Sequence, residues 1–192
     1  RRTYLSGLGT MRLGVMCSGN GTNFENIVRT CRNDEVVLMI HNKKKCGALK
    51  RAQKLGIANA HIKSVDEDQI IKLFEAWRVD LIVLAGWMRI VSPKLIAAFP
   101  NRIINLHPSM LPKYKGLHAI ERALESGDDT TGVTVHYVNE ELDGGEIILQ
   151  SEVPILPDDT LDTLTKAIQR REYYLLPEAI EHVKHTIQVG TH

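Results

Sequence analysis

Three residues of this chain have the types and the spacing that acid–base chemistry needs. Asn105 and His107 lie two positions apart at the end of an apolar run. Side chains of a strand alternate between its two faces, so these two should share one face. Pro108 cannot donate to a strand ladder, and we therefore expect the strand to end at His107. Asp143 belongs to the Gly-bearing segment 140–145, which we expect to fold back over this strand end.

An amide, an imidazole and a carboxylate in one place can donate hydrogen bonds and move protons. The carboxyl end of a strand in an open α/β sheet is also where ligands bind. A purely structural interpretation competes with this one, because Asn and His at a strand end often satisfy loop backbone groups. Taken alone, the three residues slightly favour the structural interpretation. A glycine-rich loop near the start of the chain and the motifs around residues 105–118 shift the balance toward a site.

Alternating strand and helix patterns predict the elements that must position these residues. Apolar runs predict strands at 12–17, 36–40, 57–62, 80–86, 102–107, 131–138 and 146–155. Amphipathic spacing predicts helices after residue 22 and at 46–55, 66–77, 117–126 and 160–173, with Pro177 starting a further helical segment. The fold class is therefore α/β: a single three-layer Rossmann-like domain. Its sheet should be mostly parallel, with an antiparallel edge formed by the last two strands.

Two segments carry the clearest core signal. Ile70, Leu73, Phe74 and Trp77 follow helical spacing, and we expect this stripe to be buried. The run 80–86 is continuously apolar after its first residue, as expected of a strand covered on both faces.

The segment 18–23 is rich in glycine and directly follows the first predicted strand. Gly19 and Gly21 permit a tight turn, and Thr22 or Asn23 can cap the helix that follows. A helix N-terminus reached through such a loop presents free N–H groups to a phosphate. An ordinary strand–helix turn is the alternative, since the two glycines match neither the Walker loop nor the full dinucleotide fingerprint.

The composition sets broad limits on function. The 192 residues are 43% hydrophobic and 24% charged, with a net charge of +1, so there is no bulk attraction to nucleic acid or membrane. Cys17, Cys31 and Cys46 show neither zinc-ligand spacing nor an even set for disulfides, which favours reduced thiols in the cytoplasm. Residues 1–10 carry no clear pattern and no signal-peptide signal. We expect them to form an amino-terminal extension before one domain over 11–192.

Four ordered motifs resemble one known family, the folate-dependent glycinamide ribonucleotide (GAR) formyltransferases. They are Asn105-Leu106-His107-Pro108-Ser109-Met110-Leu111-Pro112-Lys113-Tyr114, continued by Gly116-Leu117-His118; Ser18-Gly19-Asn20-Gly21-Thr22-Asn23; Leu84-Ala85-Gly86-Trp87-Met88-Arg89-Ile90; and Glu141-Leu142-Asp143-Gly144-Gly145. The resemblance runs from about Met11 to the last helix, and four motifs in this order are far more specific than any one alone.

The resemblance implies formyl transfer from 10-formyltetrahydrofolate to the amine of GAR, in de novo purine biosynthesis. Asn105 would donate to the oxyanion of the tetrahedral intermediate, and His107 would deliver a proton to the leaving nitrogen. Asp143 would orient the imidazole and favour its charged form. The transfer would be direct and would need no metal. His107, Asp143 and His136 can be considered as metal ligands, but they do not form a convincing set.

The resemblance also assigns binding residues. The phosphate of GAR would meet Gly21, Thr22 and Asn23, while Gln169 would donate to an anion and Glu172 would bind ribose hydroxyls or the glycinamide. A solvated helix face is a nearly equal alternative for the last two. Met88, Arg89, Ile90 and Val91, together with Asn105, would bind the formyl-folate. One departure stands out: many relatives carry an arginine where this chain has the segment 63–69, which contains none.

Other functions remain open from the sequence. A formyltetrahydrofolate hydrolase would use the same Asn, His and Asp with water as the acceptor. A non-catalytic nucleotide- or folate-binding module could share the fold, although the three polar residues together argue against it. Methionyl-tRNA formyltransferase fits less well, because the loop 18–23 suits a small phosphorylated substrate. The expected partners are thus GAR and 10-formyltetrahydrofolate, with no nucleic acid and no membrane.

Overall fold

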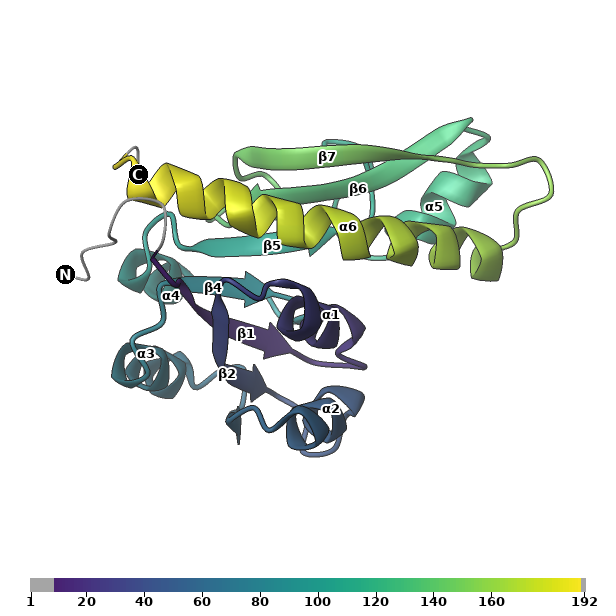
Figure 1. Cartoon of the computed structure of the whole chain (residues 1–192). Helices are drawn as coiled ribbons and strands as arrows, with labels where there is room; N and C mark the ends of the chain where they lie inside the picture. The colour runs from purple at the N-terminus through teal and green to yellow at the C-terminus, as the bar shows by residue number, and fades with distance from the viewer. Residues whose placement is uncertain (1–8, 191–192) are drawn as a thin grey trace.

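One mixed sheet forms the centre of the computed structural model, which describes residues 9–190 (Figure 1). Its strands are β1 (Arg12–Cys17), β2 (Glu35–His41), β3 (Asn59–His61), β4 (Leu81–Leu84), β5 (Ile103–His107), β6 (Thr130–Tyr137) and β7 (Ile147–Pro154). Their order across the sheet is β3-β2-β1-β4-β5-β6-β7. Pairs from β3 to β5 are parallel, whereas β6 pairs antiparallel with both β5 and β7. The predicted α/β class, parallel core and antiparallel edge are confirmed.

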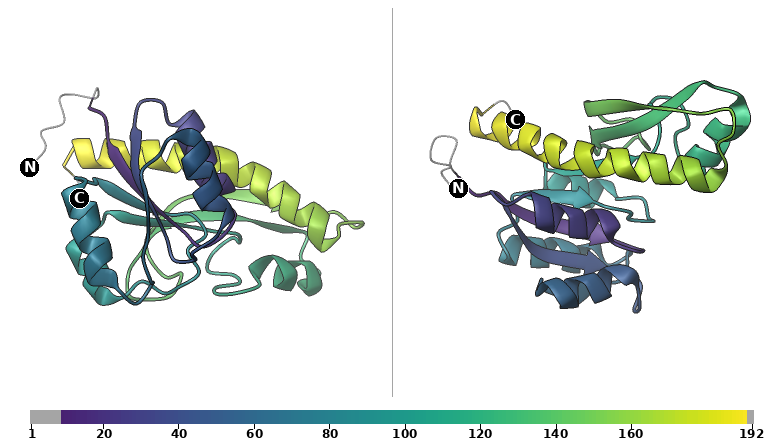
Figure 2. Two further views of the ribbon diagram at one scale, coloured as in Figure 1. Left: turned by 90° about the horizontal axis from the view of Figure 1, so that it is seen from below. Right: turned by 45° about the vertical axis from the view of Figure 1, so that its right-hand side comes forward.

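Helices cover both faces of this sheet and complete three layers. They are α1 (Thr22–Thr30), α2 (Gly47–Leu55), α3 (Glu67–Ala76), α4 (Pro93–Ala98), α5 (Ala119–Ser126) and α6 (Leu161–Gln188). One apolar core joins α1, α2 and α6 to the sheet, and a second joins α3 and α4 to the opposite face. Figure 2 shows α6 running along the length of the sheet beside α1.

Strand alternation divides the apolar side chains between these two cores. On β4, Leu81 and Val83 belong to the α6 side, while Ile82 and Leu84 belong to the α3 side. Continuous apolarity is thus the consequence of cover on both faces, as the sequence predicts. The strand itself is shorter than the predicted 80–86, because Gly86 turns the chain at a φ of 79°.

The predicted core stripe of α3 is only partly buried. Ile70 and Phe74 are fully buried, and Leu73 packs against the core at its edge. Trp77 was expected in the core but is 39% exposed. The helix ends before it, and its carbonyl oxygen accepts two hydrogen bonds from the Arg12 guanidinium at 2.8 and 3.0 Å.

The last helix is one continuous element, and the prediction that Pro177 starts a second segment is wrong. Pro177 lies inside α6, although it has no N–H for the helical bond to the carbonyl oxygen of Tyr173. The side-chain amide of Asn26 on α1 donates to that carbonyl at 2.9 Å. This replacement bond, with the buried residues Leu176 and Ile180, keeps the helix packed through the proline.

The predicted amino-terminal extension lies almost entirely outside the described residues. Within the described part of the chain, no helix combines the length and the apolarity needed to cross a membrane.

Candidate active site

Two loops meet at the carboxyl edge of the sheet, where the strand order reverses between β1 and β4. The backbone N–H of Ser18 donates to the carbonyl of Gly86 at 2.9 Å, and the N–H of Met88 donates to the Ser18 hydroxyl at 2.8 Å. Such a reversal point opens a crevice in which α/β proteins bind ligands. The fold therefore brings the glycine loop and the segment after β4 to the expected ligand edge.

Asp143 lies between two imidazoles beside the end of β5. Its carboxylate oxygens are 3.5 Å from Nδ1 of His107 and 3.6 Å from Nε2 of His136. The backbone N–H of Gly116 donates to the same carboxylate at 2.7 Å. All three side chains are nearly buried, with 6% of Asp143, 7% of His107 and 2% of His136 exposed. The loop 140–145 thus does fold back over the strand end, as predicted.

Asn105 joins this cluster through His136, the residue opposite it on β6. Its amide Nδ2 lies 3.4 Å from Nε2 of His136. Nδ1 of His136 lies 2.8 Å from the carbonyl oxygen of Tyr137, which acts as its acceptor. Nε2 of His136 thus lies between the Asn105 amide and the carboxylate of Asp143. The Asn105 amide carries two N–H groups, so its single contact with His136 leaves one of them for a ligand.

The loop after β5 holds the other nitrogen of His107. Nε2 donates to the carbonyl of Tyr114 at 2.8 Å, and the strand ends at His107 as predicted. Tyr114 has a φ of 56°, in the left-handed region that non-glycine residues rarely adopt. Arg122 lies 5.7 Å from the centre of the Tyr114 ring, and its guanidinium donates to the carbonyl of Leu117 at 3.1 Å. These contacts fix the loop and, through it, the imidazole.

The pKa values of His107 and Asp143 are both lowered, for different reasons. The pKa of His107 is lowered because burial outweighs the raising effects of the Tyr114 carbonyl and of Asp143. The sequence predicts that Asp143 favours the charged imidazole; that influence is present, but burial is stronger. The pKa of Asp143 is also lowered: burial opposes this, but hydrogen bonds from His136 and the Gly116 N–H prevail. The ground state therefore pairs a neutral imidazole with an ionised carboxylate.

The glycine loop ends in Gly21, which is the N-cap of α1 at a φ of 75°. Thr22 or Asn23 was expected as the cap, but both lie inside the helix as its first two residues, and no side chain caps it. The first N–H groups of a helix have no intrahelical partner, so this end can hold an anion. A Cβ on Gly21 would lie 2.7 Å from Cα of Ala48, so only glycine fits between the loop and α2.

Glu172 on α6 is buried beside the start of α1, where Asn23 hydrogen-bonds its carboxyl group. Burial raises the pKa of Glu172 from 4.5 to about 7, against the lowering effect of Asn23. Gln169, one turn earlier, is partly buried. A solvated helix face is therefore wrong for Glu172, and the predicted substrate residues Asn23 and Glu172 do lie together.

The predicted folate segment has a mixed character. Met88 and Ile90 are 62% and 77% exposed, whereas Val91 is buried in the core on the α3 side. Arg89 and Ile90 line a pocket of about 490 Å³ together with Ser64, Val65, Glu67, Asp68, Ser92 and Lys94. Met88, Arg89 and Ile90 can thus contact a ligand, while the side chain of Val91 anchors the loop.

Sequence reasoning left His136 without a role, although it contacts both Asn105 and Asp143. The alternation of β6 could have indicated it, because His136 lies on a strand buried on both faces, where an imidazole needs partners. The carbonyl of Tyr114 left no signal in the sequence at all. His118 is at the N-cap of α5 and is largely exposed. Among residues 9–190, no group of three or more His, Cys, Asp or Glu side chains is arranged to hold a metal ion.

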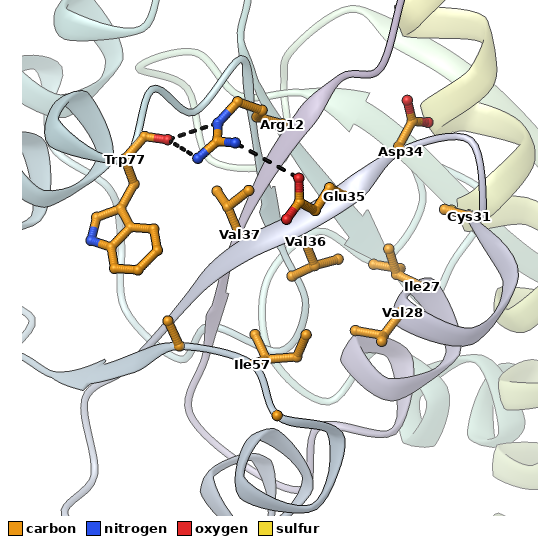
Figure 3. A pocket seen from close by; sticks show the side chains of 12 residues that line it. Arg12, Ile27, Val28, Cys31, Asp34, Glu35, Val36, Val37, Ile57 and Trp77 are labelled. Carbon is orange, nitrogen blue, oxygen red and sulfur yellow. Dashed lines mark hydrogen bonds and ion pairs between the residues drawn. The ribbon is translucent and has the colours of Figure 1, made fainter.

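A second pocket, of about 340 Å³, lies at the opposite, amino edge of the sheet (Figure 3). Apolar side chains such as Ile27, Val36 and Ile57 line it together with the charged residues Arg12, Asp34 and Glu35. Arg12 closes one side through an ion pair with Glu35 at 3.7 Å. None of the predicted site residues lines it.

Known proteins resemble this chain over most of its length. The formyl transferase family model matches residues 11–180. Phosphoribosylglycinamide formyltransferase of Haemophilus influenzae is 39% identical over 181 residues, covering 88% of this chain and 85% of that protein. Trifunctional purine biosynthetic protein adenosine-3 of Drosophila melanogaster is 40% identical over 182 residues, which cover 88% of this chain but 14% of that longer protein. The crystal structure of glycinamide ribonucleotide transformylase 1 from Symbiobacterium toebii superposes with a TM-score of 0.87 at 38% identity, covering 94% of this chain and 90% of that one.

Proposed function

The chain belongs to the formyl transferase family, and on this premise we propose that it transfers a formyl group from 10-formyltetrahydrofolate to the primary amine of GAR in purine biosynthesis. The observation that carries the proposal is the buried cluster of Asn105, His107 and Asp143 at the ligand edge of the sheet. The names of its relatives support the same reaction and the same acceptor.

The first step makes a tetrahedral intermediate. The amine lone pair attacks the formyl carbon, a C–N bond forms, and the carbonyl oxygen becomes an oxyanion. The amide of Asn105 donates its free N–H to this oxygen, while the contact with His136 keeps the amide oriented. Donors that are already aimed where charge develops stabilise the transition state most.

The second step needs a proton to move from the attacking nitrogen to the leaving one. Neutral His107 takes this proton at Nδ1, the nitrogen that faces Asp143. The imidazolium so formed donates on both sides, to the carboxylate of Asp143 and to the carbonyl of Tyr114. It then protonates N10 of the folate as the C–N10 bond breaks, which leaves tetrahydrofolate and formylated GAR. No covalent enzyme intermediate and no metal enter this scheme.

The proposed binding residues for both substrates lie near the same carboxyl edge of the sheet. The phosphate of GAR sits at the N-terminus of α1, against Gly21, Thr22 and Asn23, and Glu172 accepts from the ribose hydroxyls. Gln169 contributes a donor beside it. The formyl-folate binds along Met88, Arg89 and Ile90, with its formyl group at Asn105. We place the reaction in the cytoplasm, which the free thiols of the three cysteines support.

Product analysis tests this function directly. The purified protein is given 10-formyltetrahydrofolate with and without GAR, and the folate and ribonucleotide products are identified by mass spectrometry. Formylated GAR, formed only when both substrates are present, is the expected result. Tetrahydrofolate and formate released without GAR would instead identify a hydrolase. Absence of turnover under both conditions would indicate a binding module.

A further inference from the structure

A partly buried carbonyl in the middle of α6 receives its hydrogen bond from another helix. Pro177 has no N–H, so the carbonyl oxygen of Tyr173 lacks the donor that the helix would normally supply. Asn26 of α1 supplies it instead, with its Nδ2 at 2.9 Å. The proline therefore creates an acceptor that a side chain of the neighbouring helix can use.

The same face of α1 also contacts Glu172. Asn23 and Asn26 are three residues apart, so their side chains are neighbours on the helix surface. Asn23 hydrogen-bonds the carboxyl group of Glu172, and Asn26 bonds the backbone of the next residue, Tyr173. The two contacts together connect the first turns of α1 to the turn of α6 that carries Glu172 and Tyr173.

Apart from these two bonds, the packing between α1 and α6 around Asn26 is apolar, and a further directional contact is the buried ion pair of Lys184 with Asp34, further along α6 and beyond the end of α1. Ile27 on α1 and Ile168, Leu176 and Ile180 on α6 are fully buried in one core. Apolar burial holds two helices together but is non-directional, so it fixes their relative rotation and translation only loosely. Hydrogen bonds lose strength steeply when distance or angle changes, so they can fix both.

We propose that Asn26 is a positioning residue for the ribonucleotide site: its bond to the Tyr173 carbonyl sets how α6 lies on α1 and thereby holds Glu172 at the helix end that binds the phosphate. Asn26 acts through Glu172 and does not touch the substrate. The inference rests on the proposed function only in the identity of the ligand that Glu172 binds.

Four variants separate positioning from stability. Asn26→Ala removes the donor that the Tyr173 carbonyl uses in place of a helical N–H. Asn26→Ala combined with Pro177→Ala restores a helical N–H for that carbonyl but not the contact between the helices. Pro177→Ala alone keeps Asn26, which can share the carbonyl with the new N–H. Thr30→Ala is the matched control, because it removes a side-chain bond to a backbone carbonyl within α1.

We expect the variants to affect KM for GAR and the thermal midpoint of unfolding differently. Asn26→Ala should raise KM for GAR roughly 3- to 10-fold, as loss of one such bond permits, with KM for the formyl-folate and kcat nearly unchanged. Its thermal midpoint should fall. In the double variant the midpoint should recover while KM for GAR stays raised. Pro177→Ala and Thr30→Ala should both keep the parent KM. Recovery of KM together with the midpoint in the double variant would overturn the proposal, as would an unchanged KM in Asn26→Ala.

A second readout does not depend on catalysis. Titration of the Glu172 carboxyl carbon by NMR reports how deeply that group is buried in each variant. We expect its pKa to fall toward the ordinary value in Asn26→Ala and in the double variant, because desolvation is the largest cause of its raised value. An unchanged Glu172 pKa in both would refute the positioning role. A parent protein that fails to formylate GAR would refute the proposed function alone, and the titration would still decide the role of Asn26.

Discussion

Replacing Glu172 with glutamine should stabilise the protein at alkaline pH and weaken its binding of GAR. Burial raises the pKa of Glu172 from 4.5 to about 7. Between these two values the folded state holds a proton that the unfolded state has lost, so the free energy of unfolding falls as the pH rises. Above about pH 7 both states are ionised, and the whole cost of burying the charge is present.

The size of this cost follows from the two pKa values. At about 1.36 kcal/mol for each tenfold difference in proton affinity, the interval from 4.5 to about 7 corresponds to roughly 3 kcal/mol. Glutamine has nearly the same shape and no charge, and its amide can donate to Oδ1 of Asn23, which is buried and has no hydrogen-bond partner. Linkage then predicts that Glu172→Gln stabilises the fold by about 1 kcal/mol at pH 5 and about 3 kcal/mol at pH 8.

Urea unfolding of both proteins at pH 5 and pH 8 measures this difference, because titrations common to both cancel. Glu178→Gln, an exposed carboxylate on the same helix, is the control and should show no such pH dependence. KM for GAR should rise about tenfold in Glu172→Gln, since a hydrogen bond to a charged group is lost. A stability difference that is the same at both pH values would refute the assignment of Glu172 as a buried, titrating carboxylate.

Four further predictions concern the loops and the catalytic cluster. Asn105→Ala should lower kcat roughly 10²–10³-fold with less effect on either KM; a folded variant with near-normal kcat would remove the oxyanion role. Asp143→Asn should lower the pKa of His107 further, because the carboxylate opposes the effect of burial; NMR titration of His107 checks this, and an unchanged or higher pKa would contradict it. Gly19→Ala should leave the thermal midpoint unchanged, since a Cβ there meets no atom within 4 Å. It should raise KM for GAR, because the added methyl group lies in the loop that is proposed to hold the phosphate. Turnover should survive exhaustive chelation, and loss of activity restored by one added metal would contradict direct transfer.

Periodicity and proline placement predict most of the fold. The strand β5 ends at His107 because Pro108 follows, and β4 is apolar throughout because helices cover both of its faces. Local patterns fail where a distant residue supplies the missing partner. Pro177 was expected to break the last helix, and Asn26, 151 positions earlier, makes its continuation possible. Trp77 fits the helical stripe, but α3 has already ended before it.

The candidate site also has residues that the sequence could indicate and contacts that it could not. Asn105, His107 and Asp143 are side chains of chemistry-bearing types, so composition and spacing can point to them. The contacts that tune them come from a backbone carbonyl at Tyr114 and from His136 on the neighbouring strand. A backbone carbonyl carries no sequence signal, and the pairing of His136 with Asn105 depends on the register between β5 and β6.

Two buried carboxylates at this edge have pKa values that move in opposite directions. Burial opposes the ionised form of Asp143, but hydrogen bonds from His136 and from the Gly116 N–H lower its pKa. Glu172 receives one hydrogen bond, from Asn23, and burial raises its pKa to about 7. Asp143 thus stays ionised and can stabilise the imidazolium of His107 at the moment it forms. Glu172 changes its protonation near neutral pH, where a bound ribonucleotide that donates hydroxyl hydrogens would favour the ionised form. Environments that separate two similar groups in this way support the different roles proposed for them, proton transfer for Asp143 and substrate binding for Glu172.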